Sequence, residues 1–173
     1  MIPAAQMLIA EMESEAATTR RVLERVPDER LDWRPHPKSM SLGQLAHHVA
    51  SIPGAIAGLG ERDSLDATTV DFEPARAESA AALVPTLEGS VAAARAFLAG
   101  LTEERAAATW RLTAGEREVF AVPRLGLLRT IGLNHWYHHR GQLCVYLRLL
   151  DVPVPVVYGK TADENPFAAA GVA

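Results

Sequence analysis

The stretch NHWYHHRGQL, residues 134–143, lies within a proline-free run of apolar residues at helical spacing, about residues 125–150. This spacing predicts one long helix. Because each residue of an α-helix turns by about 100°, His135 and His139 stand one turn apart on the same face. We therefore expect two imidazoles to point into a packed interior. The rest of that face is mostly apolar and consists of Leu128, Ile131, Gln142, Tyr146 and Leu149.

This pair of histidines alone leaves metal binding open. A His-x-x-x-His pair also occurs by chance, and a histidine on an apolar face is more often hydrogen-bonded in the core than bound to a metal. Trp136 stands where the H-E-x-x-H motif has its glutamate, so the sequence does not indicate a metalloprotease helix of that type. His138 is adjacent, and either i,i+3 or i,i+4 pairing is compatible with one ion.

Length and composition indicate one domain, residues 1–173, that is mainly helical and cytoplasmic. The single cysteine, Cys144, excludes an internal disulfide and fits a reducing compartment. The net charge is −4 with no basic block, so a nucleic-acid partner is not indicated. We expect no membrane span, because no run approaches the required length, and no signal peptide.

Three helices and one long loop are predicted before the histidine-bearing helix. The first helix spans residues 3 to about 26, with Pro3 in its first turn. The second begins at a capping box, Ser41 to Gln44, and Pro53-Gly54 is expected to kink it or end it early. Residues 60–78 show no clear period and are interpreted as a surface loop. A third helix follows at about 79–100.

The remaining elements complete an all-α prediction. Residues 109–112 and 118–122 alternate in a pattern typical of a small hairpin. After the histidine-bearing helix, the apolar tail 152–159 is expected to be extended and to pack back on the helices. The predicted fold class is therefore all-α, a four-helix bundle with a small β-hairpin before the last helix.

The second helix contains another histidine pair, His47-His48. On a helical wheel, His48 lies at the border of the apolar stripe of this helix, whereas His47 lies nearly opposite the centre of the stripe. We therefore expect His48 to face the bundle and His47 to face solvent. His36, in the proline-rich linker, is expected at the surface.

His48, His135 and His139 thus form the candidate ligand set of an open metal site. Neutral imidazole nitrogens bind Zn²⁺ at about 2.0–2.1 Å, and three protein ligands leave a position for water or substrate. The same ligand type also admits Ni²⁺, Fe²⁺ or Mn²⁺. Cys144 lies about 180° round the helix from His135, so it is a poor fourth ligand and is interpreted as a buried, inert thiol.

Three segments together resemble the DinB/YfiT-like superfamily: SLGQLAHH (41–48), HWYHHRGQL (135–143) and YLRLLDVPVP (146–155) followed by Tyr158-Gly159. The similarity runs over nearly the whole chain, and His-x-x-x-His-Arg-Gly-Gln is its most specific part. The resemblance implies a four-helix bundle that holds one divalent metal ion through His48, His135 and His139. It also implies a homodimer.

The resemblance further suggests what the protein does. Relatives transfer low-molecular-weight thiols (bacillithiol, mycothiol or glutathione) to electrophiles, or isomerise maleylpyruvate with mycothiol, and others are regarded as hydrolases. We therefore expect a metal-dependent enzyme of thiol-transferase type that uses Zn²⁺ or Ni²⁺ and acts on a small molecule. A metal-dependent hydrolase is the alternative reaction. A non-catalytic metal- or ligand-binding stress-response protein is the alternative from another class.

Other residues of this region receive weaker assignments. Gln142 lies one turn beyond His139 and is the candidate catalytic residue, expected to orient substrate or a ligand; an ordinary interhelical hydrogen bond is equally compatible. Asn134 and Tyr158 are weaker candidates for a supporting role. Trp136 and Tyr137 are expected in packing. Arg140 and Arg148 face away from the histidines and are expected at the surface or in a dimer interface.

Overall fold

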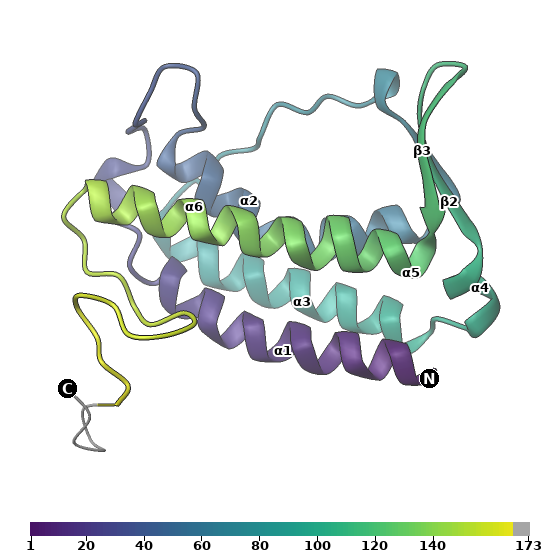
Figure 1. Ribbon diagram of the computed structural model, residues 1–173. Coiled ribbons are helices and arrows are strands. Elements are labelled where there is room, and N and C mark those ends of the chain that lie inside the picture. Colours follow the sequence, from purple (N-terminus) through teal and green to yellow (C-terminus); the bar gives the residue numbers. More distant parts are fainter. Residues whose placement is uncertain (168–173) are drawn as a thin grey trace.

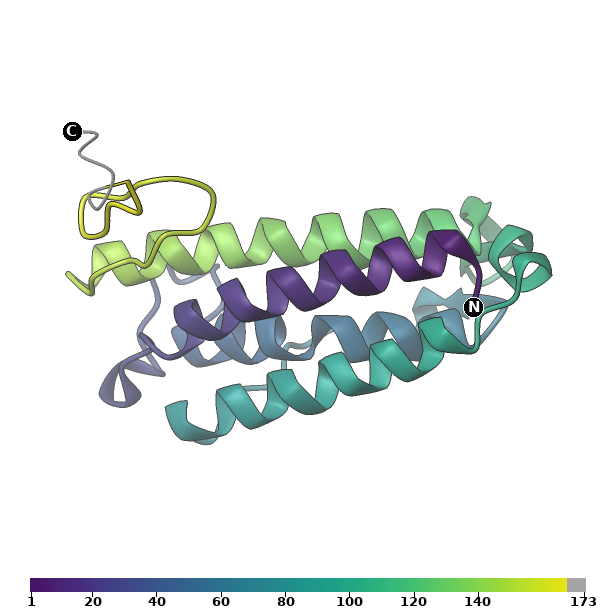
Figure 2. The same cartoon turned by 90° about the horizontal axis from the view of Figure 1, so that it is seen from below.

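Four long helices lie side by side in the computed structural model, which describes residues 1–167 (Figures 1 and 2). They are α1 (Pro3–Leu23), α2 (Leu42–Gly60), α3 (Leu83–Ala99) and α6 (His135–Leu149). α2 packs against α3 and α6, and α1 packs against the same two helices. Of the predicted all-α four-helix bundle, the mostly helical fold is therefore confirmed. The prediction is incomplete, because a third strand extends the predicted hairpin into a sheet and several short helical segments connect the long helices.

The short segments connect the long helices. They are η1 (Asp28–Arg30), η2 (Ala67–Thr69), η3 (Ala80–Ala82), α4 (Glu103–Ala107), α5 (Arg124–Leu127) and η4 (Leu128–Asn134). α5, η4 and α6 follow one another without a break, so the predicted fourth helix has the expected extent. However, η4 is π-helical. A π-helix turns less per residue than an α-helix, so residues before His135 do not simply continue the face on which His135 lies.

A small sheet stands at one end of the helices (Figure 1). β2 (Thr109–Ala114) and β3 (Arg117–Pro123) form the predicted antiparallel hairpin, which turns at Gly115 with a φ of 62°. Only a residue that tolerates the left-handed region fits this turn without strain, and glycine is the usual choice. β1 (Ser64–Asp66) pairs with β2 in parallel, and the sequence prediction missed it by assigning residues 60–78 to a loop.

Helix α2 begins at the predicted capping box and continues through Pro53 to Gly60, so the expectation of an early end is wrong. Proline has no N–H, which leaves the carbonyl of Val49, four residues earlier, without its helical donor. The indole Nε1 of Trp136 donates to this carbonyl at 2.8 Å. From the other side, Ser90 Oγ accepts from the backbone N–H of Gly54 at 2.7 Å. The interruption in α2 is thus repaired by α6 and α3, and the Trp136 bond fixes α6 beside α2.

Replacing Trp136 with Phe is expected to destabilise the protein by about 1–3 kcal/mol beyond the loss of ring volume, because the buried Val49 carbonyl loses its donor. Restoring a backbone N–H with Pro53→Ala should remove much of that penalty. Urea unfolding of the two single variants and the double variant measures the coupling. If Trp136→Phe costs the same in both backgrounds, the indole is not compensating for the proline.

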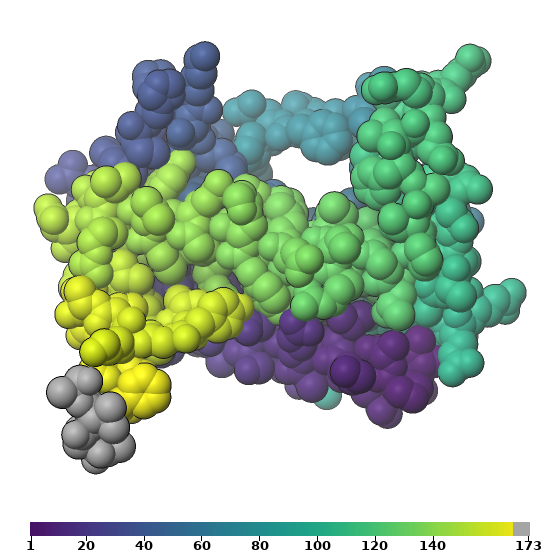
Figure 3. All heavy atoms as spheres, in the orientation of Figure 1, coloured from purple at the N-terminus to yellow at the C-terminus, as the bar shows by residue number. Residues whose placement is uncertain are grey.

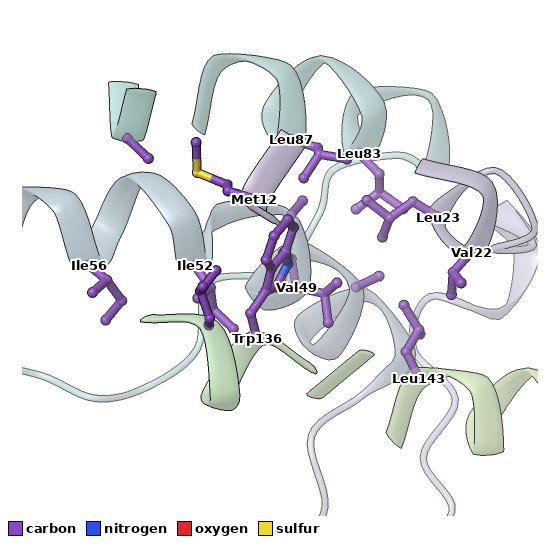
Figure 4. Close-up of a cluster of buried hydrophobic side chains, with 14 of the residues drawn as sticks. Met12, Val22, Leu23, Val49, Ile52, Ile56, Leu83, Leu87, Trp136 and Leu143 are labelled. Carbon is purple, nitrogen blue, oxygen red and sulfur yellow. The ribbon is translucent and has the colours of Figure 1, made fainter. Parts of the chain in front are cut away.

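The core lies between the four long helices, and Figure 4 shows Trp136 of α6 among side chains that include Met12, Val49 and Ile52. The core face of α6 consists of Trp136, Arg140, Leu143 and Leu147. It is therefore not the His135 face predicted from the sequence, on which Leu149 is 57% exposed. His135 and His139 are half-buried and lie at the edge of the core.

The segment after α6 packs back on the helices, as predicted. Val154 is buried, and its N–H donates to the carboxylate of Asp163 at 2.8 Å. The same carboxylate pairs with Arg148, which is exposed and thus at the surface as expected. Of the predicted domain 1–173, the last six residues lie outside the part that the structure describes.

One helical stretch in the described chain, Ala80–Ala99, is long and apolar enough to cross a membrane by length and composition alone. The expectation that no run reaches this length is therefore wrong by that measure. One such stretch is only a weak indication of a span, because core helices of soluble proteins can be equally long and apolar. Glu88 and Arg95 of this stretch pair with Arg20 and Glu13 of α1, as in a helix packed within a folded domain.

Candidate metal centre

The structure brings together the three histidines selected from the sequence. His135 and His139 lie one turn apart at the start of α6, and His48 faces them from α2. The Nε2 atom of His135 is 2.8 Å from Nε2 of His139 and 3.4 Å from Nε2 of His48. One ligand atom from each ring lies within 4.8 Å of the others. Three imidazole nitrogens therefore converge on one point.

This arrangement fits a divalent cation. In a tetrahedral site with bonds of about 2.0–2.1 Å, ligand nitrogens are about 3.3 Å apart. The His48–His135 separation matches this value, and the shorter His135–His139 separation needs only a small ring rotation to reach it. Between two facing nitrogens there is room for one proton at most, so the cluster has unshared electron pairs that point inward. Within residues 1–167, the cluster contains no carboxylate or thiolate, so its donors are nitrogen alone.

The histidines are held in the neutral form that binds metals. Burial, together with the neighbouring His139 and His135 rings, lowers the pKa of His48 to about 4. Burial also lowers the pKa values of His135 and His139. At neutral pH the three rings are therefore uncharged, and a cation does not have to displace protons to bind them.

Gln142 contacts one of these rings directly. Its Oε1 lies 2.7 Å from Nδ1 of His139. An amide oxygen only accepts, so Nδ1 carries the proton and donates it, and Nε2 keeps its electron pair for the metal point. This contact lies within α6 rather than between helices, and it would hold the His139 ring in one orientation. Nδ1 of His135 is buried and has no hydrogen-bond partner within the described chain. Burial lowers the pKa of this ring, and the nearby backbone of Ile131 offsets part of that shift.

Gln142→Ala is expected to weaken metal binding about 10- to 100-fold, because His139 loses the acceptor that fixes its tautomer and ring orientation. Gln142→Glu keeps an acceptor at this position and should retain the wild-type affinity or exceed it. Competition against a chromophoric chelator measures both variants. An affinity of Gln142→Ala within twofold of the wild type would show that Gln142 does not position the ring.

The weaker candidates, Asn134 and Tyr158, form hydrogen bonds to groups other than the three histidines. Asn134 Oδ1 accepts from Arg129 at 2.6 Å. Tyr158 contacts Glu15 at 2.9 Å on the α1 side of the molecule.

Cys144 is half-buried, and burial raises its pKa, which suits the inert role predicted for it. His36 is exposed, as expected.

Arg140 differs most from its prediction. It was expected to lie at the surface or in a dimer interface, but its side chain is 1% exposed. Its Nη2 atom is 2.6 Å from Oε2 of Glu15 and 2.6 Å from the hydroxyl of Tyr158. The guanidinium also lies over the ring of Tyr137, 5.3 Å from its centroid. The reason is that α6 is covered on two sides, by α2 and by α1 with the C-terminal segment.

His47 also differs from its prediction. It is half-buried rather than directed into solvent, and it lines a pocket of about 380 Å³ together with His48. The outer wall of this pocket is residues 71–75, which belong to the segment predicted as a surface loop. Figure 3 shows the molecule hollowed beneath this segment. No periodicity marks these residues, so the sequence gives no signal for their place beside the histidines.

A mostly helical fold with a three-histidine cluster compatible with metal binding defines the class of this protein. The model of the DinB family matches residues 1–166. The chain therefore belongs to the DinB family.

Solved structures agree with this fold. A DinB-like protein from Bacillus subtilis is 19% identical, with a TM-score of 0.66 over 88% of this chain and 96% of that chain. A DinB-like protein from Bacillus cereus is 23% identical, with a TM-score of 0.63 over 87% of this chain and 95% of that chain. No curated protein matches this chain significantly.

Proposed function

We propose that this protein binds one divalent metal ion, Zn²⁺ or Ni²⁺, through His48, His135 and His139, and that it is a metal-dependent enzyme of thiol-transferase type. The substrates would be a low-molecular-weight thiol, such as bacillithiol, mycothiol or glutathione, and a small electrophile. The observation that carries this proposal is the convergence of three neutral imidazole nitrogens next to an open pocket. Three protein ligands leave a coordination position for an exogenous group.

The chemistry follows from this arrangement. A bound divalent cation supplies Lewis acidity, which lowers the pKa of a thiol or water that it binds. In the transfer, the thiol loses its proton, its sulfur forms a bond to the electrophilic carbon, and the leaving group departs with the bonding electrons. The three histidines hold the reacting centre in place, and Gln142 keeps His139 in the required tautomer. The pocket beside His48 gives the substrates access.

The test is an activity screen of metal-loaded protein with each of the three thiols and the electrophile monochlorobimane. We expect consumption of at least one thiol that depends on the metal and is lost in His135→Ala. Ester hydrolysis without any thiol would point to the hydrolase instead. Neither activity, with metal bound, would favour the non-catalytic metal-binding protein.

We also propose that the protein is a cytoplasmic homodimer. Val145 and Leu149 stand one turn apart on the outer face of α6 and are 58% and 57% exposed. An apolar strip of this kind suits a self-complementary contact between two copies. Sedimentation equilibrium tests the oligomeric state, and a single species of monomer mass at micromolar concentration would contradict the proposal.

A further inference from the structure

The pocket beside the metal centre has a defined wall. It is about 380 Å³ in volume, which is within the range of small-molecule sites. His48 belongs both to the histidine cluster and to the pocket lining, so the pocket borders the metal centre. Its outer wall is residues 71–75, which pass over the start of α2.

Two carboxylates stand on this wall, those of Asp71 and Glu73. Oε1 of Glu73 accepts from Nε2 of Gln44 at 3.2 Å, and Oδ1 of Asp71 accepts from the backbone N–H of Glu73 at 2.9 Å. The segment is also tied to α2 by the N–H of Ala77, which donates to the Gly43 carbonyl at 3.2 Å. The Glu73 carboxylate is therefore tied to α2, and the Asp71 carboxylate caps the backbone of its own segment. Both side chains are exposed on the outer wall of the pocket.

Within residues 1–167, no lysine or arginine lines the pocket to balance them. The nearest cation along the segment, Arg76, pairs with Asp32 at 3.2 Å. The other notable feature of the lining is apolar. Phe72 is 66% exposed, and Met40 lies in the same lining. The pocket thus combines negative charge with a surface on which an apolar or sugar-like group can rest.

We propose that Asp71 and Glu73 select by charge the molecules that reach the metal centre. Cationic and uncharged ligands are accepted, and ligands with several carboxylates are disfavoured. This inference rests on the proposed function and narrows its substrate class. Of the three thiols named above, glutathione and bacillithiol carry carboxylates and are disfavoured, whereas mycothiol, which has none, is favoured. Two unit charges acting across a few ångströms of wet pocket change the affinity ratio of a cation to an anion by about five- to tenfold.

The experiment uses cobalt-loaded protein and three thiols of similar size: cysteamine (cationic), 2-mercaptoethanol (uncharged) and 3-mercaptopropionate (anionic). Binding is read from the sulfur-to-cobalt charge-transfer absorption. The test variant is Asp71→Asn with Glu73→Gln, which keeps both shapes and the acceptor oxygens. The matched control is Glu103→Gln with Glu104→Gln on α4, which changes the net charge equally at the far end of the molecule (Figure 1).

We expect the affinity ratio of cysteamine to 3-mercaptopropionate to fall about five- to tenfold in the test variant and to stay unchanged in the control. Affinity for 2-mercaptoethanol should change by less than twofold, and the difference should shrink in 1 M salt. An unchanged ratio with all three thiols still bound would overturn charge selection and leave the proposed function intact.

If no thiol binds, the thiol-transferase proposal fails, and a second series decides the inference. Imidazole, histamine and imidazole-4-acetate span the same charges and are read from the cobalt d–d bands. The same fall in the ratio of histamine to imidazole-4-acetate is expected there, and its absence would overturn charge selection. Failure of the protein to take up cobalt would overturn both proposals.

Discussion

His135→Ala is expected to lower the metal content of the purified protein from one equivalent to nearly none. Structural zinc sites with four ligands bind with about 10–16 kcal/mol, or roughly 3 kcal/mol per ligand. Losing one of three ligands should therefore weaken binding about 100- to 1,000-fold. His135 is the sharpest choice, because its Nε2 lies within 3.4 Å of both other Nε2 atoms. Elemental analysis after gel filtration measures the change.

The same change should remove the stabilisation that metal gives to the fold. A ligand at about 1,000 times its Kd stabilises the folded state by about 4 kcal/mol. Added Zn²⁺ should therefore raise the Tm of the wild type by several degrees and leave the Tm of His135→Ala unchanged. His138→Ala is the matched control, because His138 is an exposed histidine on the same helix. Full metal content in His135→Ala, or its loss in His138→Ala, would contradict the assigned site.

The metal cluster could be predicted because it depends mainly on local geometry. The spacing of His135 and His139 places them one turn apart in any α-helix, whatever packs around it. The border position of His48 on α2 follows in the same way from its apolar stripe. Neither step requires the relative placement of the helices. The helical wheel did not predict how deeply the three rings are buried. They lie half-buried at the edge of the core, where an open site can form.

The errors arise where distant segments meet. The sequence predicted that only one side of α6, the His135 face, is buried. In the structure α1 and the C-terminal segment cover a second side and enclose Arg140. Pro53-Gly54 was expected to kink α2 or end it early, because sequence alone does not show that Trp136 supplies a donor to Val49 from 87 residues away. The strand β1 pairs in parallel with β2 across a long separation, and the pocket wall at 71–75 has no periodic pattern.

Glu15→Ala is expected to destabilise the protein by about 3–5 kcal/mol, because it leaves the guanidinium of Arg140 buried without its carboxylate. The side chains of this pair are 1% and 16% exposed, and the carboxylate is the only anion that contacts the guanidinium within the described chain. The remaining acceptors, such as Thr19 Oγ1 at 3.1 Å, are neutral. For a chain of this length the Tm should fall by about 6–20 °C.

Glu13→Ala provides the control within the same helix. Glu13 pairs with Arg95 at 3.3 Å, but these side chains are 46% and 66% exposed, so this loss should cost less than about 1 kcal/mol. Replacing the buried pair together, with Glu15→Leu and Arg140→Met, should recover most of the stability, because no uncompensated charge remains. Equal effects of Glu15→Ala and Glu13→Ala in urea unfolding would mean that water reaches Arg140. The buried pair would then not be what fixes the metal-binding helix to α1.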